Sequence, residues 1–154
     1  AVVYQFNPDW SGQVVAESVG GGWVSLLVQQ ADDAVLSGDR TQSDRCVLRK
    51  WAKSDITETD TYLQSTKGGK YINGEKSTAI DDIYAKKFPE CYIKSLEKYQ
   101  AKAYIIAPIF IGERLWGLLG VYQNDGPRTW DGSERAIIEQ VANQVGVSLQ
   151  LSEY

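Results

Sequence analysis

The chain has 154 residues, 43% of them hydrophobic and 23% charged, a composition typical of one folded domain with a sizeable core. A formal net charge of −4 and dispersed Lys and Arg argue against a nucleic-acid-binding surface. The absence of histidine excludes a His-based catalytic triad and His-ligated zinc, and two cysteines are too few for an all-cysteine zinc site. These counts lead us to expect no metal site. No apolar run approaches the roughly 20 residues that span a bilayer, and no signal peptide is visible, so we expect a cytosolic protein.

The first residues predict a β-hairpin. Val2–Phe6 has the composition of a strand, residues 7–12 carry turn residues, and Gln13–Val19 forms the returning strand. Glycines then interrupt the pattern, and residues 23–30 predict a short helix with an apolar face.

The middle of the chain is less regular. Residues 31–42 predict a loop, and Ser54–Gly74 predicts a second, long polar loop. Long ordered loops are often binding loops or lids, so Tyr62 and Tyr71 are candidates to fold over a ligand. Residues 75–80 then predict a short strand.

A helix is predicted to begin near Pro89, because Ile93 and Leu96 follow at helical spacing. Cys91 falls in its first turn, where unpaired N–H groups and the helix dipole favour an anion and lower the pKa of a thiol. A reactive attachment point and a half-buried cysteine that packs as a small hydrophobe are both consistent with this position. A disulfide with Cys46 is disfavoured in a cytosolic protein.

The end of the chain predicts a hairpin and a helix. Ala103–Ile111 and Leu115–Gln123 read as antiparallel strands joined by a turn at residues 112–114. Asp131 followed by Glu134 resembles a capping box at the start of the last helix. That helix carries one predicted apolar stripe: Ile137, Ile138, Val141, Val145 and Leu149.

The run DDIYAKKFPECYIKSLEKYQAKAYIIAPIF, followed by LWGLLGVYQNDGPRTW, resembles the bilin-binding GAF domains of cyanobacteriochromes, which are relatives of phytochromes. The opening run VVYQFNPDWSGQVVAESV and Gly22–Trp23 resemble the first hairpin of the same domains. The resemblance covers nearly the whole chain. It implies an α/β (α+β) fold, with a central, mostly antiparallel sheet flanked by helices on both sides. Residues 1–154 would form a single photosensory domain, a fragment of a larger sensor protein.

The resemblance also implies a cofactor and its attachment. The family's covalent cysteine corresponds to Cys91, which would form a thioether with a linear tetrapyrrole, phycocyanobilin. Tyr92 stands where most members have a histidine under the bilin rings, so a titratable donor is lost there. Tyr122 ends a strand where members place side chains near the D ring, and Tyr71 is a further expected contact.

The carboxylate that would face the pyrrole nitrogens has two candidates. Many members carry an aspartate, matching Asp44, and some a second bilin-reactive cysteine two residues later, matching Cys46. In an alternative register, Leu48 takes the aspartate's place, as in the green/red and far-red lineage, and Glu17 becomes the main carboxylate. We prefer this second register. Trp51, at the end of the same run, is a further expected bilin contact.

The expected function is light sensing rather than catalysis. Light would isomerise the double bond between the C and D rings, with green/red switching linked to pigment protonation or with far-red/orange switching. The terminal helix would join a homodimer and lead to an output domain such as a histidine kinase. The alternative is a GAF module without pigment, used for dimerisation or small-ligand sensing.

Overall fold

The computed structural model describes residues 1–18, 40–43, 47–52, 55–72, 74–85, 88–98 and 100–152. For residues 40–43, 47–52, 55–59, 61, 62, 70 and 98 it describes the backbone alone, so the side chain of Tyr62 lies outside the description. Within this part of the chain, no helix combines the length and apolarity needed to cross a membrane.

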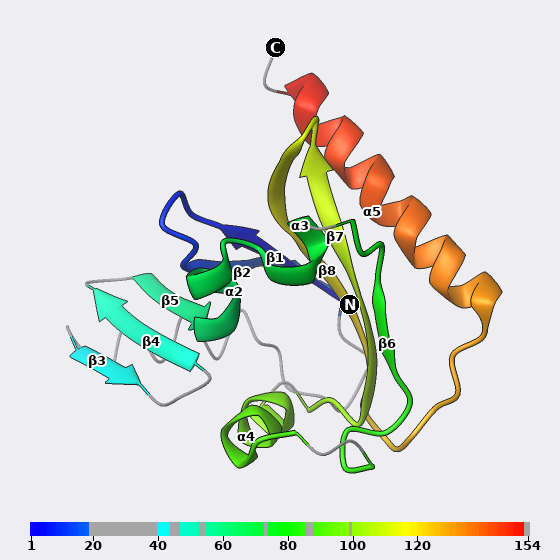
Figure 1. Cartoon of the computed structure of the whole chain (residues 1–154), viewed down its shortest axis with the longest axis horizontal. Helices are drawn as coiled ribbons and strands as arrows, with labels where there is room; N and C mark the ends of the chain where they lie inside the picture. The colour runs from blue at the N-terminus through cyan, green and yellow to red at the C-terminus, as the bar shows by residue number, and fades with distance from the viewer. Residues whose placement is uncertain are drawn as a thin grey trace.

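A five-stranded antiparallel sheet forms the centre of the fold (Figure 1). Its strands lie in the order β2-β1-β8-β7-β6. They span β2 (Gly12–Glu17), β1 (Val2–Phe6), β8 (Arg114–Gln123), β7 (Ala103–Ile111) and β6 (Thr78–Ile80). The hairpins β1–β2 and β7–β8 were both predicted from sequence and are confirmed.

Helix α5 (Gly132–Ser152) covers one face of this sheet, along β7 and β8 (Figure 1). Ile109, Leu119 and Ala142 form the centre of its contact with the sheet, and Val145 and Leu149 pack against them. Gly146 allows the close approach, because a Cβ there would lie 2.1 Å from the Phe110 carbonyl oxygen. We call this side of the sheet the α5 face.

The other face carries helix α4 (Glu90–Lys98), the short helices α2 (Thr61–Thr66) and α3 (Gly69–Ile72), and a second sheet. The second sheet has three antiparallel strands in the order β3-β4-β5, with β3 (Arg40–Ser43), β4 (Val47–Ala52) and β5 (Asp55–Asp60). It contacts β2 through β5 and α4 through β4. The predicted arrangement, a mostly antiparallel sheet with helices on both sides, is therefore confirmed.

The two predicted loops were partly wrong. Residues 40–42 belong to β3, and residues 54–74 contain β5, α2 and α3 rather than one long loop. The error came from polarity: the sequence DITETD is polar, yet its alternation and β-branched residues suit a strand. The Asp60 side chain accepts a hydrogen bond from the Leu63 amide at 3.1 Å and caps α2. The helix predicted at residues 23–30 lies outside the described residues.

The apolar stripe predicted on the last helix is also divided. Ile138, Val145 and Leu149 pack on the sheet, whereas the side chains of Ile137 and Val141 are exposed. The four exposed large apolar residues of α5 share a separate stripe: Ile137, Val141, Val147 and Leu151. The single predicted stripe was therefore wrong, because the helix has two apolar sides.

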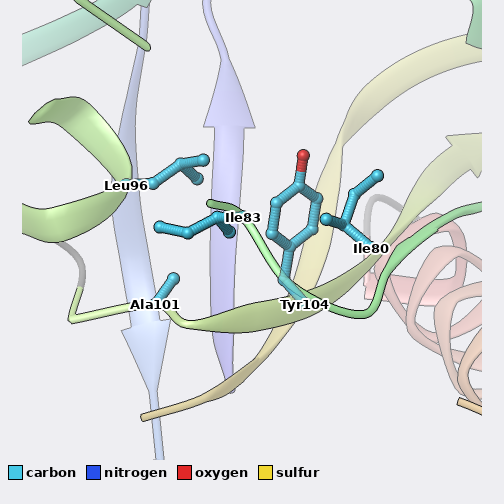
Figure 2. Close-up of a cluster of buried hydrophobic side chains, with 5 residues drawn as sticks. All are labelled: Ile80, Ile83, Leu96, Ala101 and Tyr104. Atoms are coloured by element: carbon cyan, nitrogen blue, oxygen red, sulfur yellow. The ribbon is translucent and has the colours of Figure 1, made fainter. Parts of the chain in front are cut away.

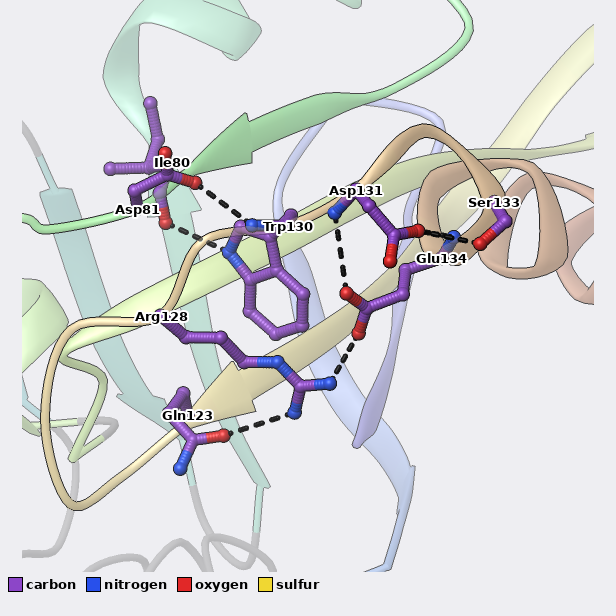
Figure 3. Close-up of polar contacts among 8 residues, drawn as sticks. All are labelled: Ile80, Asp81, Gln123, Arg128, Trp130, Asp131, Ser133 and Glu134. Carbon is purple, nitrogen blue, oxygen red and sulfur yellow. Dashed lines mark hydrogen bonds and ion pairs between the residues drawn. The ribbon is translucent and has the colours of Figure 1, made fainter.

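The start of α5 is fixed to β6 through polar contacts (Figure 3). Asp131 and Glu134 form the predicted capping box: the Glu134 amide donates to Asp131 at 2.8 Å, and the Asp131 amide donates to Glu134 at 3.2 Å. The Trp130 indole donates to the Ile80 carbonyl at 3.0 Å. Arg128 lies over the Trp130 ring and pairs with Glu134. These contacts hold the entry of α5 against the edge strand.

Candidate functional site

Helix α4 presents Cys91 at its N-terminal end. The Ile93 amide donates to the Pro89 carbonyl at 3.1 Å, so Pro89 lies just before the first helical residue and its missing N–H costs nothing. Leu96 is buried against the sheet, while Glu90 and Lys94 pair on the exposed side. The predicted position of Cys91 in the first turn is confirmed.

The Cys91 sulfur takes part in a disulfide whose partner lies outside the described residues. The expectation that Cys91 avoids a disulfide was therefore wrong for this structure. Any addition chemistry at Cys91 requires that this disulfide first be reduced.

Four tyrosines form a cluster on the sheet face that carries α4: Tyr71, Tyr92, Tyr104 and Tyr122. Their hydroxyls are close enough to interact electrostatically. Burial raises the pKa of Tyr104 most, and Tyr92, Tyr71 and Tyr122 raise it further. The rings of Tyr104 and Tyr122 meet edge to face with centroids 6.3 Å apart. We call this group the phenol cluster and this side of the sheet the phenol face.

Tyr104 stands on β7 at the centre of the cluster. Figure 2 shows its ring between Ile80 and Ile83, with the hydroxyl at the end far from the strand. Its hydroxyl oxygen lies 3.4 Å from that of Tyr92, longer than the usual O–H···O range of about 2.5–3.0 Å. Burial raises the pKa of both phenols, so both are neutral at neutral pH. A buried hydroxyl without a good partner costs about 1–3 kcal/mol.

Tyr122 lies across a glycine in its own strand. A Cβ at Gly120 would come within 2.7 Å of the Tyr122 hydroxyl oxygen, so only glycine leaves room for this ring position. Tyr122 also packs against Val2 and Val14 on the neighbouring hairpin. It therefore connects the phenol cluster to β1 and β2.

Tyr71 closes the cluster from α3. It is 5% exposed, and its hydroxyl oxygen lies 3.0 Å from that of Thr78 on β6. Burial raises the pKa of Tyr71 to about 12, although the contact with Thr78 acts in the opposite direction. The prediction that Tyr71 folds toward the interior is consistent with this position; its role as a ligand contact stays a prediction.

The strand register places Glu17 on the phenol face. Glu17 pairs with Val2, and Val2 pairs with Gly120, so all three share one face of the sheet. The side chain of Glu17 is half-buried. A carboxylate thus lies at the edge of the face that holds the phenol cluster.

Four expected bilin contacts fall on residues whose side chains lie outside the described part of the chain. Asp44 and Cys46 lie outside the described residues, and Leu48 and Trp51 lie in β4, for which only the backbone is described. The choice between the two carboxylate registers therefore stays a prediction. Sequence reasoning missed Tyr104, although it carries the single side-chain hydroxyl in the apolar strand AYIIAPIFI and pairs with Tyr122 in the hairpin.

The phenol face is suited to a flat unsaturated ligand more than to a metal. Among the described residues, no three Cys, Asp or Glu side chains lie close enough to hold a metal ion. Edge-to-face rings, apolar side chains and weakly partnered hydroxyls instead fit a conjugated ring system with acceptor oxygens. The residues present therefore fit the bilin that the sequence resemblance implies.

Comparison with known proteins identifies the family of this chain. Residues 2–149 match the GAF domain family. The putative methyl-accepting chemotaxis protein sll0041 of Synechocystis sp. PCC 6803 is 30% identical over 152 residues, which are 99% of this chain and 12% of that protein. The chain thus spans about an eighth of that relative's length. Over 98 residues it is 33% identical to the circadian input-output histidine kinase CikA of the same organism, covering 61% of this chain and 13% of that protein.

Solved structures give the same result. GAF3 of Slr1393 from Synechocystis sp. PCC6803, in its photoproduct state, has a TM-score of 0.76 and 36% identity over 99% of this chain and 82% of that chain. The red light-absorbing state of NpR6012g4, a red/green cyanobacteriochrome, has a TM-score of 0.75 and 40% sequence identity, over 99% of this chain and 83% of that chain. The far-red absorbing dark state of JSC1_58120g3 with bound biliverdin IXa has a TM-score of 0.75 and 28% sequence identity, over 99% of this chain and 80% of that chain. The chain belongs to the GAF domain family, and its fold matches the cyanobacteriochrome GAF domains of the red/green and far-red types.

Proposed function

We propose that this domain is a photosensor that holds phycocyanobilin, a linear tetrapyrrole, through a thioether at Cys91. The single observation that carries the proposal is the common location of α4, the phenol cluster and Glu17 on one face of the central sheet. The likeness to GAF domains of red/green and far-red cyanobacteriochromes supports it. The bilin would supply the photochemistry, an isomerisation at the double bond between its C and D rings.

Attachment is an addition without a change in total oxidation state. The sulfur of Cys91 forms a bond to one carbon of an exocyclic double bond on the terminal pyrrole ring, and the thiol proton ends on the other carbon. The position of Cys91 in the first turn of α4 suits this addition, because the helix dipole and free N–H groups there stabilise the negative charge that develops on the attacking sulfur. The disulfide at Cys91 must be reduced beforehand.

Glu17 is the carboxylate that we assign to the pyrrole nitrogens. A carboxylate close to a protonated pyrrole raises the pKa of that nitrogen, since each charge favours the other. Tyr92 stands where most family members carry histidine, and its raised pKa keeps it neutral. We therefore assign the control of pigment charge to Glu17 rather than to Tyr92. Green/red switching linked to proton loss and far-red/orange switching are the two colour classes that remain.

The exposed apolar stripe of α5 is the proposed dimer surface. Ile137 is 57% exposed and Leu151 is 70% exposed, although both are large aliphatic side chains. A second copy of the same helix would bury this stripe in a two-helix contact. The similarity to the histidine kinase CikA supports an output domain of that class in the full protein.

Mass spectrometry of the pigmented protein tests the attachment. The chain co-produced with phycocyanobilin under reducing conditions should keep its colour in acid urea, and the pigment should map to the peptide that holds Cys91. Cys91→Ser should lose all covalent pigment, whereas Cys46→Ser should keep it. Covalent pigment on the Cys91→Ser protein would contradict the proposal, and so would a folded wild-type protein that binds no bilin and instead behaves as a plain GAF module.

A further inference from the structure

The hydroxyl pair of Tyr92 and Tyr104 has more hydrogen-bonding capacity than its surroundings use. Each phenol offers one donor and two acceptor sites. The contact between the two oxygens uses one donor at most, and at 3.4 Å it is a weak bond. Within the described part of the chain, the Tyr104 hydroxyl makes no other hydrogen bond. At least one donor therefore remains to be satisfied.

Burial makes this observation informative. Tyr104 is 3% exposed, and Ile83 and Ala101 beside it are fully buried, so bulk water does not serve the hydroxyl. Buried hydroxyls in folded proteins nearly always have a partner, and an orphaned one indicates a missing group. The ring itself is well packed, since Ile80 and Leu96 belong to the same cluster (Figure 2).

We propose that Tyr104, paired with Tyr92, donates a hydrogen bond to an acceptor oxygen of the bilin, either a lactam carbonyl or a propionate carboxylate. This inference rests on the proposed function and adds to it a residue that positions and tunes the pigment. A neutral phenol donates without adding charge, so it can bind an oxygen without competing with Glu17 for the pigment's protons. The raised pKa of both phenols supports this neutral role.

The neighbouring rings agree with a flat ligand at this place. Phe88 meets Tyr92 edge to face at 4.9 Å between centroids, and Tyr122 meets Tyr104 in the same manner. Such rings offer apolar walls on which a conjugated system can stack. The hydroxyls of Tyr92 and Tyr104 add polar atoms to this group of rings.

Tyr104→Phe tests the proposal, because it removes the hydroxyl and keeps the packed ring. The matched control is Tyr84→Phe, since Tyr84 is 53% exposed and its hydroxyl meets only the Lys102 ammonium at 3.5 Å among the described residues. Thermal unfolding is measured for each variant without bilin and with covalent bilin. We expect Tyr104→Phe to leave the melting temperature of the bilin-free protein unchanged or higher, and to lower that of the pigmented protein. A purely structural hydroxyl would lower both.

Affinity and colour identify the oxygen. In a Cys91→Ser background, which leaves only reversible binding, Tyr104→Phe should weaken phycocyanobilin binding by roughly threefold to tenfold. A shift of the absorption maximum in the Cys91-containing protein would assign the contact to a lactam carbonyl, which is conjugated with the pigment. Weaker binding with an unchanged maximum would assign it to a propionate carboxylate.

The inference is overturned if the pigmented Tyr104→Phe protein matches wild type in melting temperature, affinity and absorption, as Tyr84→Phe should. That outcome leaves the proposed function intact, because Cys91 still carries the pigment. If the wild-type protein itself binds no bilin, the proposed function fails, and the inference fails with it.

Discussion

The two faces of the central sheet differ in chemistry although the same strands build both. On the α5 face, Ala107, Ile109 and Ala142 are fully buried and aliphatic, and the helix approaches the sheet closely at Gly146. On the phenol face, the buried side chains include two tyrosines: the Tyr71 hydroxyl contacts Thr78 at 3.0 Å, whereas the Tyr104 hydroxyl has only a long contact of 3.4 Å with Tyr92.

The two faces contribute differently: packing on the α5 face stabilises the fold, whereas the phenol face offers polar atoms that a ligand could bind. Strand β7 alternates, so Ile105, Ala107 and Ile109 face α5, while Tyr104 and Ile106 face α4. Close aliphatic packing stabilises without specificity for a ligand, whereas polar atoms held in an apolar setting cost stability until something binds them. The phenol face therefore has the features of a binding surface.

The largest effect should come from the α5 face. Ile109→Ala leaves a cavity at a fully buried site and should lower the free energy of unfolding by about 2–5 kcal/mol. Bilin attachment at a temperature where the variant is folded should remain, because Ile109 faces away from the phenol cluster. Urea unfolding checks the first part, and Ile72→Ala, at a residue that is 48% exposed and lies outside the proposed dimer surface, is the control and should stay within about 0.5 kcal/mol of wild type. Loss of bilin attachment in folded Ile109→Ala would contradict the claim that the α5 face and the phenol face act independently.

Alkaline pH should destabilise the protein through the phenol face, where burial raises the pKa of Tyr71. The pKa of Tyr71 is raised to about 12 from 10.0, so the folded state holds a proton that the unfolded state releases above about pH 10. Stability is therefore full below pH 10 and is lost as pH rises toward 12, by roughly 2–3 kcal/mol for Tyr71. Unfolding measured against pH in the bilin-free protein checks this. Tyr71→Phe should flatten the decline, and an unchanged decline in that variant would assign it to other groups.

A smaller effect should follow from closing the gap at α5. Gly146→Ala would place a Cβ against the Phe110 carbonyl and should destabilise by about 1–3 kcal/mol, even after the better helix propensity of alanine is counted. Gly132→Ala in the same helix meets nothing within 4 Å and serves as the matched control. Thermal melts compare the two. Equal melting temperatures would mean that the helix can shift away from the sheet without cost.

Local signals predicted much of the fold. The hairpin β7–β8 follows from two apolar runs around Gly112, and the α5 start follows from Asp131 and Glu134. The errors arose where tertiary contacts decide. The polar strand β5 forms because β4 pairs with it, and the two apolar sides of α5 cannot be separated before the sheet's position is known.

The site was predicted less completely. Cys91, Tyr92 and Tyr122 were identified from the family resemblance, and the structure places the two tyrosines in one cluster. Tyr104 was missed, because a tyrosine in a buried strand is usually core and its hydroxyl becomes notable only when its neighbours are known. The disulfide at Cys91 was not predicted, because no local pattern in the sequence encodes a pairing that forms only in the folded chain.

The most direct measurement is the absorption spectrum of the chain co-produced with phycocyanobilin, taken before and after illumination and again in acid urea. The account predicts a visible band that switches reversibly with light and a pigment that stays attached after denaturation. Green and red bands that interconvert with pH in the dark would assign protonation-linked switching, and a band beyond the red would assign the far-red class. A correctly folded, reduced protein without bound pigment would contradict the central claim that the phenol face is a bilin site.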